Sequence, residues 1–349
     1  MTPDNAALWL PRPGATFEVR AAPYTAPAPD QVVVRVRAVA VNPVDAFPGI
    51  FYRMMVPWLT FPAVIGSDVA GEIVQLGAGV TRLHVGDRVL GMAVGVERDR
   101  NRAAEGAFQH YAVLPQTLVS PIPDALSFEQ ACVLPLALST AATGLFQSDH
   151  LGLPLPTVAP PPRDETVLVW GASTSVGSNA VQLARGAGYR VIATSSPQNF
   201  DYLRSLGAES TIDRRSRTAA DDIVTALDGR TLAGSYAIGR RSLRPTLDVV
   251  ASVPGSRRIA TAQPSVAVRF DLLGRRRHGV RVTPVWGGTL RSNEVGPGIY
   301  AEYLPAALAE GTYRATPEAL VIGEGLEQIP AALTRLRRGV SAQKLVIRV

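Results

Sequence analysis

The sequence predicts an α/β protein with two domains, one rich in β-strands and one built on a doubly wound parallel sheet. Its 349 residues are too many for one ordinary core and suit two domains. Short apolar segments, separated by Gly and Pro about every 8–12 residues, fill the first part of the chain and indicate strands. After residue 165, apolar strands alternate with amphipathic helices, which is typical of a parallel sheet covered by helices.

The β-rich part contains one long strand and several short ones. Residues 32–41, VVVRVRAVAV, alternate between apolar and polar positions, so we expect a half-buried strand there. Further short strands, interrupted or bounded by glycine, are predicted within residues 64–80, 86–92 and 106–115.

The hydrophobic period changes after residue 126. Ser127 is a suitable helix N-cap, and Gln130 stands three residues later, as in a capping box. Residues 127–146 are therefore predicted to form a long helix rich in small residues. The proline-rich stretch that follows, residues 152–165, is predicted to be a surface loop.

The alternation of strands and helices defines the predicted domain boundaries. It continues to about residue 285, and the remaining residues contribute helices and a last strand. We therefore expect residues 127–285 to form the domain with the parallel sheet. Residues 286–349 are expected to return to residues 1–126 and complete the β-rich domain.

The composition excludes several classes of protein. Hydrophobic residues make up 46% and charged residues 18%, which is typical of a globular chain. No apolar run reaches the roughly 18 residues of a membrane span, and the N-terminus lacks the pattern of a secretory signal. The single Cys132 excludes an intramolecular disulfide framework. We therefore expect a cytoplasmic protein.

The net charge of +6 does not by itself indicate a partner. Of the 35 basic residues, 34 are Arg and Lys344 is the single Lys, an imbalance that GC-rich codons explain. Nucleic-acid binding favours basic stripes interleaved with aromatic residues. The basic segments 239–244 and 272–281 lack such aromatic residues, so no nucleic-acid partner is expected.

Residues 168–197, LVWGASTSVGSNAVQLARGAGYRVIATSSP, have the pattern of a strand, a loop, a helix and a second strand. The start of such a helix presents N–H groups and the positive end of the helix dipole, where a dinucleotide pyrophosphate binds. The Gly-x-Gly-x-x-Gly fingerprint falls on Ala172, Thr174 and Gly177, so only its third glycine is kept, the one that lets the helix pack close to the strand. Hydroxyl groups that could contact the phosphates stand in the same loop, on Ser173, Thr174 and Ser175. A plain α/β turn is the alternative.

The second strand of this unit ends in hydroxyl side chains. Ser195 and Ser196 stand 18 and 19 residues after Gly177, where an Asp or Glu would bind the ribose of NAD and repel a 2′-phosphate. The two hydroxyls, with Asn199 and the later Arg214, can accept a phosphate instead, so NADP is favoured over NAD. The alternative is a serine-rich turn with Asn199 as the N-cap of a helix.

Several motifs, taken in order, resemble the zinc-independent, quinone-oxidoreductase-like branch of the medium-chain dehydrogenase/reductase superfamily. They are VNPVD (41–45), VIGSDVAGEIVQLGAGV (64–80) and GDRVLG (86–91). Within that superfamily the chain is more narrowly similar to the trans-acting enoyl reductases of polyketide synthesis. That similarity lies in residues 134–146, 194–208, 293–308 and 339–349.

The resemblance implies a GroES-like substrate domain and a Rossmann cofactor domain, with the active site in the cleft between them. It also implies cofactor contacts at the positions of Asn42 and Asp45, Ser173, Thr174, Ser175 and Val176, Ser196 and Asn199, Arg214, and Val340 and Ser341. Two positions depart from the family pattern. Arg214 stands where relatives usually have Tyr, and Phe47 stands where they carry Lys after the VNPVD motif.

The zinc ligands of metal-dependent relatives are not matched. Asn42 stands at the first ligand position, Ser67 stands where His would be, and Cys132 alone cannot supply the rest. The four histidines show no ligand spacing, so no metal is expected; they are His84, His110, His150 and His278. Without a Lewis acid, reduction of an activated C=C bond is easier than oxidation of an alcohol, with hydride reaching the β-carbon and a proton the α-carbon.

Two hydroxyl residues are candidate catalytic groups. Some enoyl reductases of the superfamily have a Tyr shortly after a glycine, and Tyr52 in GIFYRMM is the nearest match, offset by one residue. The alternatives are an aromatic residue in an apolar loop and solvent water as the acid. Thr140 and its neighbour Ser139 lie where relatives line the cleft, although both could instead bond to a carbonyl of their own helix. The expected substrate-lining strand end is Trp286, Gly287, Gly288 and Thr289, with a plain turn as the alternative.

The leading functional hypothesis is NADPH-dependent reduction of an α,β-unsaturated carbonyl or enoyl thioester. An NADPH:quinone oxidoreductase is one alternative, and a non-catalytic NADPH-binding sensor or structural protein is another. Arg275, Arg276 and Arg277 could attract an acidic acyl carrier protein, or could simply form a solvated surface. A monomer or homodimer without a membrane partner is expected.

Overall fold

The computed structural model describes residues 3–47, 49–263, 268 and 279–349. The chain forms two compact units. The first contains Met1–Leu136, Tyr300–Gly311 and Glu318–Val349, and the second contains Ala137–Ile299 and Thr312–Pro317. These boundaries differ from the expected ones, because residues 127–136 belong to the first unit, and residues 286–299 and 312–317 belong to the second.

A seven-stranded sheet forms the core of the first unit, in the order β15-β16-β3-β5-β6-β8, with β7 also paired to β3. Its strands are β3 (Gln31–Ala40), β5 (Asp68–Leu76), β6 (Arg88–Met92), β7 (Tyr111–Pro115), β8 (Val119–Pro121), β15 (Glu318–Glu324) and β16 (Gln343–Arg348). A three-stranded sheet contains β1 (Asn5–Leu10), β2 (Glu18–Ala22) and β4 (Ala63–Val64). The helices of this unit include α1 (Gly49–Met55), α2 (Phe128–Ala131), α10 (Leu304–Ala309) and α11 (Ile329–Arg338).

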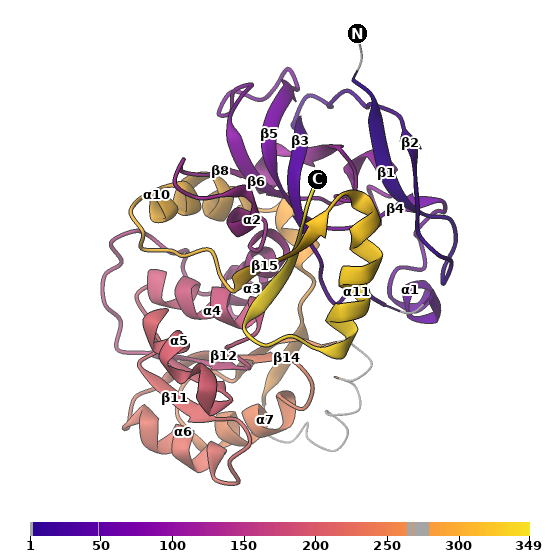
Figure 1. The fold of residues 1–349 in the computed structure, drawn as a ribbon. Coiled ribbons are helices and arrows are strands. Elements are labelled where there is room, and N and C mark those ends of the chain that lie inside the picture. The colour runs from indigo at the N-terminus through magenta and orange to yellow at the C-terminus, as the bar shows by residue number, and fades with distance from the viewer. Residues whose placement is uncertain (1–2, 48, 264–267, 269–278) are drawn as a thin grey trace. The chain divides into compact units, whose positions relative to one another are not determined.

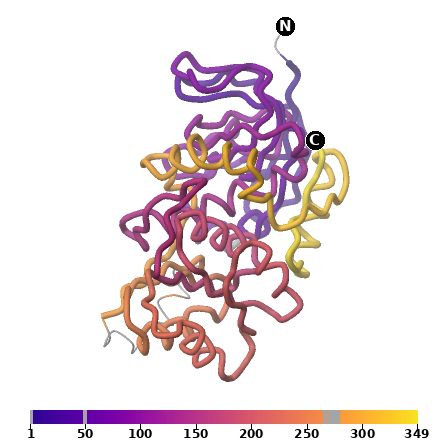
Figure 2. Tube along the Cα trace, turned by 90° about the vertical axis from the view of Figure 1, so that its left-hand side faces the viewer, coloured from indigo at the N-terminus to yellow at the C-terminus, as the bar shows by residue number. Residues whose placement is uncertain are grey.

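Strand β3 is more deeply buried than its sequence pattern predicts. Only Arg35 and Arg37 are partly exposed, so the expectation of a half-buried strand was wrong. The reason is that β3 pairs with three strands, of which β16 comes from the last residues of the chain. Figure 2 shows this yellow C-terminal segment beside the indigo and violet N-terminal strands.

The helix expected over residues 127–146 is two helices, α2 and α3 (Pro135–Phe146). The capping box is confirmed, since the Ser127 hydroxyl accepts from the Gln130 N–H and the Gln130 side chain accepts from the Ser127 N–H. The prediction of one continuous helix was wrong because Pro135 has no N–H and disfavours helical backbone at Leu134. Pro135 instead begins the second helix.

A six-stranded sheet in which every neighbouring pair is parallel forms the core of the second unit, in the order β11-β10-β9-β12-β13-β14. Its strands are β9 (Thr166–Trp170), β10 (Arg190–Ser195), β11 (Ser210–Asp213), β12 (Leu232–Ile238), β13 (Arg258–Ala262) and β14 (Arg281–Pro284). The order reverses between β9 and β12, so the predicted doubly wound sheet is confirmed. The loops after β9 and β12 therefore flank the position where such sheets bind ligands.

Helices cover both faces of the parallel sheet (Figure 1). A hydrophobic core that includes Leu168, Ile192 and Ile259 joins one face to α6 (Ala219–Leu227) and α7 (Leu243–Ser252). Tyr236 points from the opposite face, and its hydroxyl donates to the Thr140 carbonyl of α3 over 2.6 Å. The remaining helices include α4 (Ser175–Gly186), α5 (Phe200–Ser205) and α9 (Val295–Pro297). Among the described residues, no helix has both the length and the apolar character needed to cross a membrane.

Candidate active site

The turn between β9 and α4 has the geometry of an anion-binding helix start. Gly171 adopts a left-handed backbone with φ of +80°, and the Thr174 hydroxyl donates to its carbonyl over 2.8 Å. The same hydroxyl accepts from the Gly177 N–H over 3.1 Å and so caps the 12-residue helix α4. The first N–H groups of a helix, here those of Ser175 and Val176, have no acceptor within it and favour an anion.

Gly177 is the fingerprint glycine that the sequence keeps, and its close packing explains why. A Cβ atom at this position would lie 2.4 Å from the Gly171 carbonyl oxygen and 2.6 Å from the Ala172 Cα. Real Cβ atoms do not approach backbone so closely, so only glycine allows α4 to begin against the end of β9.

Polar groups without a carboxylate occupy the end of β10. The Ser195 hydroxyl is buried and donates to the Ser196 carbonyl over 3.0 Å, so it is turned into the protein. Asn199 precedes α5, but its side chain makes no capping hydrogen bond. Arg214, at the end of β11, is exposed, and its N–H donates to the Ser195 carbonyl over 2.9 Å. The nearby Asp213 accepts from the Arg215 N–H over 3.0 Å.

Two groups of predicted substrate-site residues meet within the second unit. A Cβ atom on Gly287 would lie 2.7 Å from the Thr140 Oγ1, so the glycine lets this hydroxyl approach the backbone. The Thr289 hydroxyl donates to the Trp286 carbonyl over 3.0 Å and accepts from the Gln147 amide over 2.9 Å. Gly288 accepts through its carbonyl from Arg291, and Ser139 is fully buried on α3.

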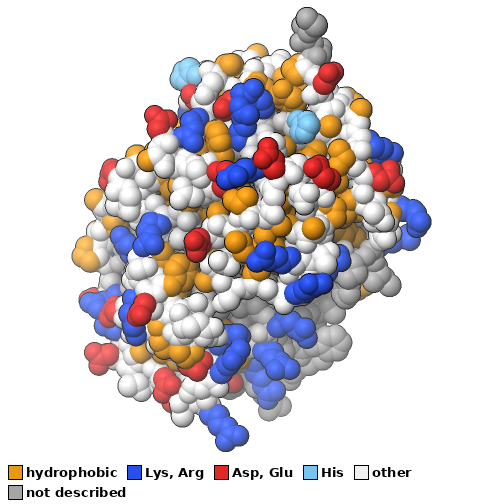
Figure 3. Space-filling view, viewed as in Figure 1, with side chains coloured by type: hydrophobic (Ala, Val, Ile, Leu, Met, Phe, Trp, Pro, Cys, Tyr) orange, Lys and Arg blue, Asp and Glu red, His pale blue; other side chains and the backbone are white. Residues whose placement is uncertain are grey.

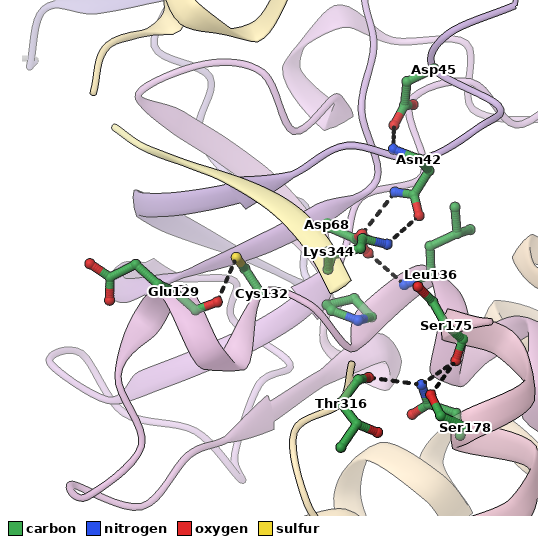
Figure 4. A network of polar contacts seen from close by, with 12 residues as sticks. Asn42, Asp45, Asp68, Glu129, Cys132, Leu136, Ser175, Ser178, Thr316 and Lys344 are labelled. Atoms are coloured by element: carbon green, nitrogen blue, oxygen red, sulfur yellow. Dashed lines mark hydrogen bonds and ion pairs between the residues drawn. The ribbon is translucent and has the colours of Figure 1, made fainter. Parts of the chain in front are cut away.

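A buried polar cluster in the first unit links Asn42, Asp68 and Lys344 (Figure 4). Asp68 is 0% exposed and accepts from the Lys344 ammonium over 2.9 Å, the Asn42 side-chain amide over 2.8 Å and the Leu136 N–H over 2.6 Å. The Lys344 ammonium also donates to the Asn42 Oδ1. These partners fix which atom of the Asn42 amide is oxygen and which is nitrogen.

Asp45 and Tyr52 lie beside this cluster on the chain that follows Asn42. Asp45 accepts from the Asn42 N–H over 2.8 Å and is 4% exposed. Burial raises the pKa of Asp45 to about 7, although the hydrogen bond from the Asn42 backbone opposes the rise. Burial also raises the pKa of the Tyr52 phenol well above its usual value, and the nearby Asp45 carboxylate adds to that rise. Tyr52 therefore keeps its proton at neutral pH and can act as a hydrogen-bond donor.

Val340 and Ser341 lie in the exposed turn between α11 and β16. The turn is formed by left-handed backbone on both sides, with φ of +95° at Gly339 and +49° at Ala342. Near the end of α11, the Arg337 guanidinium donates to the Ala46 carbonyl over 2.8 Å. Arg337 thus connects this C-terminal helix to the turn that contains Asn42 and Asp45, a contact that the sequence did not reveal.

The predicted site residues divide between the two units. Asn42, Asp45, Tyr52, Val340 and Ser341 belong to the first, and the others belong to the second. Arg275, Arg276, Arg277 and His278 lie outside the described residues.

Comparison with known proteins identifies the family. The model of the alcohol dehydrogenase GroES-like domain matches residues 28–124. The chain is 43% identical to the dehydrogenase pigH of Monascus ruber and 34% identical to the trans-enoyl reductase tndF of Aspergillus flavipes, in each case over 99% of both chains. The quinone oxidoreductase of Coxiella burnetii shares the fold, with a TM-score of 0.70 and 21% identity over 99% of this chain and 100% of that one.

The chain belongs to the medium-chain dehydrogenase/reductase superfamily. It is therefore an oxidoreductase of a superfamily whose members are NAD(P)-dependent, and a small-molecule substrate follows from that membership. The predicted combination of a GroES-like domain and a Rossmann-type parallel sheet is confirmed.

The side chains of this oxidoreductase at the family's zinc position do not fit a zinc ion. Asn42 stands at the first ligand position, and its amide is already engaged by the Asp68 carboxylate and the Lys344 ammonium. An ammonium at hydrogen-bonding distance would repel a dication, and a neutral amide is a poor zinc ligand. Ser67 is buried at the second position. Among the described residues, no group of three or more His, Cys, Asp or Glu side chains could hold a metal.

The oxidoreductase also contains candidate site residues that the sequence-based prediction missed. Asp68 and Lys344 were not selected, although both lie within the polar cluster. One signal was available, because Lys344 is the single lysine of a chain that otherwise uses arginine. Their pairing could not be derived locally, since 302 residues separate Lys344 from Asn42.

Proposed function

We propose that the protein uses NADPH to reduce an activated C=C bond, in an α,β-unsaturated carbonyl or an enoyl thioester, without a metal ion. The observation that carries this proposal is the donor set at the family's zinc position, where an amide, a carboxylate and an ammonium satisfy one another. A site without a Lewis acid suits conjugate reduction better than alcohol oxidation. The 34% identity to a protein named as a trans-enoyl reductase supports the same reaction.

Most of the proposed cofactor contacts belong to the second unit, and those at Asn42, Asp45, Val340 and Ser341 belong to the first. The N–H groups at the start of α4 and the loop of Ser173 and Thr174 would hold the pyrophosphate. At the end of β10 no carboxylate repels a 2′-phosphate, and the exposed Arg214 would attract one, together with Ser196. When bound, NADPH supplies the hydride.

The protein's own groups would then act on the substrate. In the first unit, the Tyr52 phenol, which stays protonated, is a candidate donor of a hydrogen bond to the carbonyl oxygen as it gains negative charge. In the second unit, the Thr140 hydroxyl is the corresponding candidate. Trp286, Gly287, Gly288 and Thr289 would line the substrate site. The α-carbon receives its proton from Tyr52 or from water.

NADPH oxidation with two acceptors tests this proposal. We expect turnover of a crotonyl thioester, with NADPH preferred over NADH, and little turnover of a naphthoquinone. Turnover of the quinone alone would replace the proposal with an NADPH:quinone oxidoreductase, for which the shared fold of the Coxiella burnetii enzyme is the supporting observation. Tight NADPH binding without turnover of either acceptor would indicate a sensor or structural protein.

A further inference from the structure

The single lysine of the chain occupies an unusual position. A chain that uses Arg at 34 of 35 basic positions has Lys at residue 344, and this side chain is 4% exposed. Buried lysines are rare because removing an ammonium from water costs free energy that only close partners can offset. Lys344 has such partners in Asp68 and Asn42.

We propose that Lys344 is a positioning residue of the active site, which holds the Asn42 amide and with it the turn from Asn42 to Asp45. The cation is fixed from one side by Asp68, and it fixes the Asn42 Oδ1 on the other (Figure 4). The expected effect of Lys344 on kcat rests on the proposed function. The expected effect of Lys344 on the position of Asn42 and on Tm does not.

The geometry requires an ammonium rather than a guanidinium. A lysine head group is a compact charge with three donors arranged around one nitrogen, so it can contact two adjacent acceptors in a small space. Asp68 already accepts from three donors, one of which is the Leu136 backbone N–H at the start of α3. A larger planar head group in the same space would displace the Asn42 amide.

Hydrogen bonds connect this cluster to the turn that follows Asn42 and fix the backbone of that turn. The Asn42 N–H donates to Asp45, which anchors the first and fourth residues of the turn to each other. Arg337 holds the next residue through the Ala46 carbonyl. Two cations from the last part of the chain, one buried and one near the surface, thus determine where this turn lies in the first unit.

The test compares three variants with the wild-type protein. Lys344→Met alone leaves Asp68 buried and unpaired, and should lower Tm by about 5–10 °C. Lys344→Met with Asp68→Asn removes both charges, so it should recover most of that loss. We expect this double variant to fold with a Tm near that of wild type, yet to show a kcat about 10- to 100-fold lower, because the Asn42 amide has lost the donor that orients it.

A matched control is available in the same unit. Arg100 and Glu105 form another ion pair, with a 2.7 Å contact and a buried carboxylate, but no predicted site residue bonds to them. Arg100→Met with Glu105→Gln should change kcat by less than about 2-fold. Lys344→Arg keeps the charge and adds bulk, so we expect it to regain thermal stability relative to Lys344→Met while kcat stays low.

A folded double variant with wild-type kcat would overturn the inference, as would Lys344→Arg with wild-type Tm and kcat. If the double variant does not fold, the Tm and kcat of Lys344→Arg test the inference on their own. Failure of the proposed function would look different. The wild-type protein would then fail to reduce an enoyl thioester, whereas the loss of Tm in Lys344→Met and its recovery in the double variant would still report on the cluster.

Discussion

Each of the two units contains a group of charged residues, and these groups differ in burial and pairing. In the first unit, Asp68 and Lys344 pair in the interior. In the second, the guanidinium groups of Arg214, Arg240 and Arg241 are exposed at the ends of β11 and β12, and no described residue forms an ion pair with them. Figure 3 shows Lys and Arg side chains gathered on the lower part of the drawn face, in the region where Figure 1 labels α7.

The difference indicates two kinds of site. The geometry around the buried pair is set when the chain folds, whereas the exposed arginines gain a partner only when a ligand binds. A buried pair holds its neighbours rigidly, because losing either partner leaves an uncompensated charge. Exposed arginines keep their rotamer freedom and cost little without a partner, so they are available to an anion such as a cofactor phosphate. Substitutions at four positions test this difference.

The largest effect is expected at Lys344. Lys344→Met should lower the free energy of unfolding by about 3–5 kcal/mol, because Asp68 remains buried without its counter-charge. The matched control is Arg190→Met, which removes an exposed pair with Glu209 and should cost about 1 kcal/mol or less. Urea denaturation of both variants measures the difference. Equal urea midpoints for Lys344→Met and Arg190→Met would mean that the buried pair contributes no more to stability than the exposed pair.

Asp45 should make stability depend on pH. Its pKa in the folded protein is raised to about 7, so the folded state binds more protons than the unfolded state between roughly pH 4 and pH 7. The contribution of Asp45 to stability therefore falls as pH rises through this window, by up to about 1.4 kcal/mol per pH unit. Asp45→Asn should abolish that slope. The measurement is the difference in unfolding free energy between the two proteins from pH 4 to pH 8, and a constant difference would refute the raised pKa.

Gly177→Ala tests the close packing at the start of α4. The new methyl group would lie 2.4 Å from the Gly171 carbonyl oxygen, so the helix must move away from β9. We expect a loss of about 1–3 kcal/mol in stability and a clear loss of NADPH affinity. Unchanged affinity, measured by isothermal titration, would show that the pyrophosphate does not bind at this turn.

The smallest effect is expected at Arg214. Arg214→Gln should weaken NADPH binding by about 10-fold and leave NADH binding unchanged, because only NADPH carries the 2′-phosphate. Arg217→Gln, at an exposed position three residues later, is the control and should affect both nucleotides equally. An equal loss for NADPH and NADH in Arg214→Gln would remove this residue from the specificity site.

Local patterns allowed part of the fold to be predicted. The capping box at Ser127 and the close approach at Gly177 depend on residues within a few positions of each other, and both were identified from the sequence. The break before Pro135 was also local, but the run of small apolar residues around it concealed the boundary. The burial of β3 was not local, because its neighbours β7 and β16 come from distant parts of the chain.

The same distinction applies to the candidate site. Thr174 and Gly177 follow a known loop pattern, whereas Asp68 and Lys344 lie in separate segments of the chain and meet only when it folds. The Ser195 hydroxyl was selected from its place at a strand end, yet it is turned toward the Ser196 carbonyl, a detail that depends on its rotamer. Such orientations follow from packing and are not visible in residue order.

The most direct test of the central claim is the rate of NADPH-dependent reduction of a crotonyl thioester before and after exhaustive removal of divalent metals, with zinc measured in the same samples. We expect an unchanged rate and no stoichiometric zinc, because Asn42, which stands where relatives place a metal ligand, is bonded to the Lys344 ammonium. A rate that falls on chelation and returns with added zinc would contradict it.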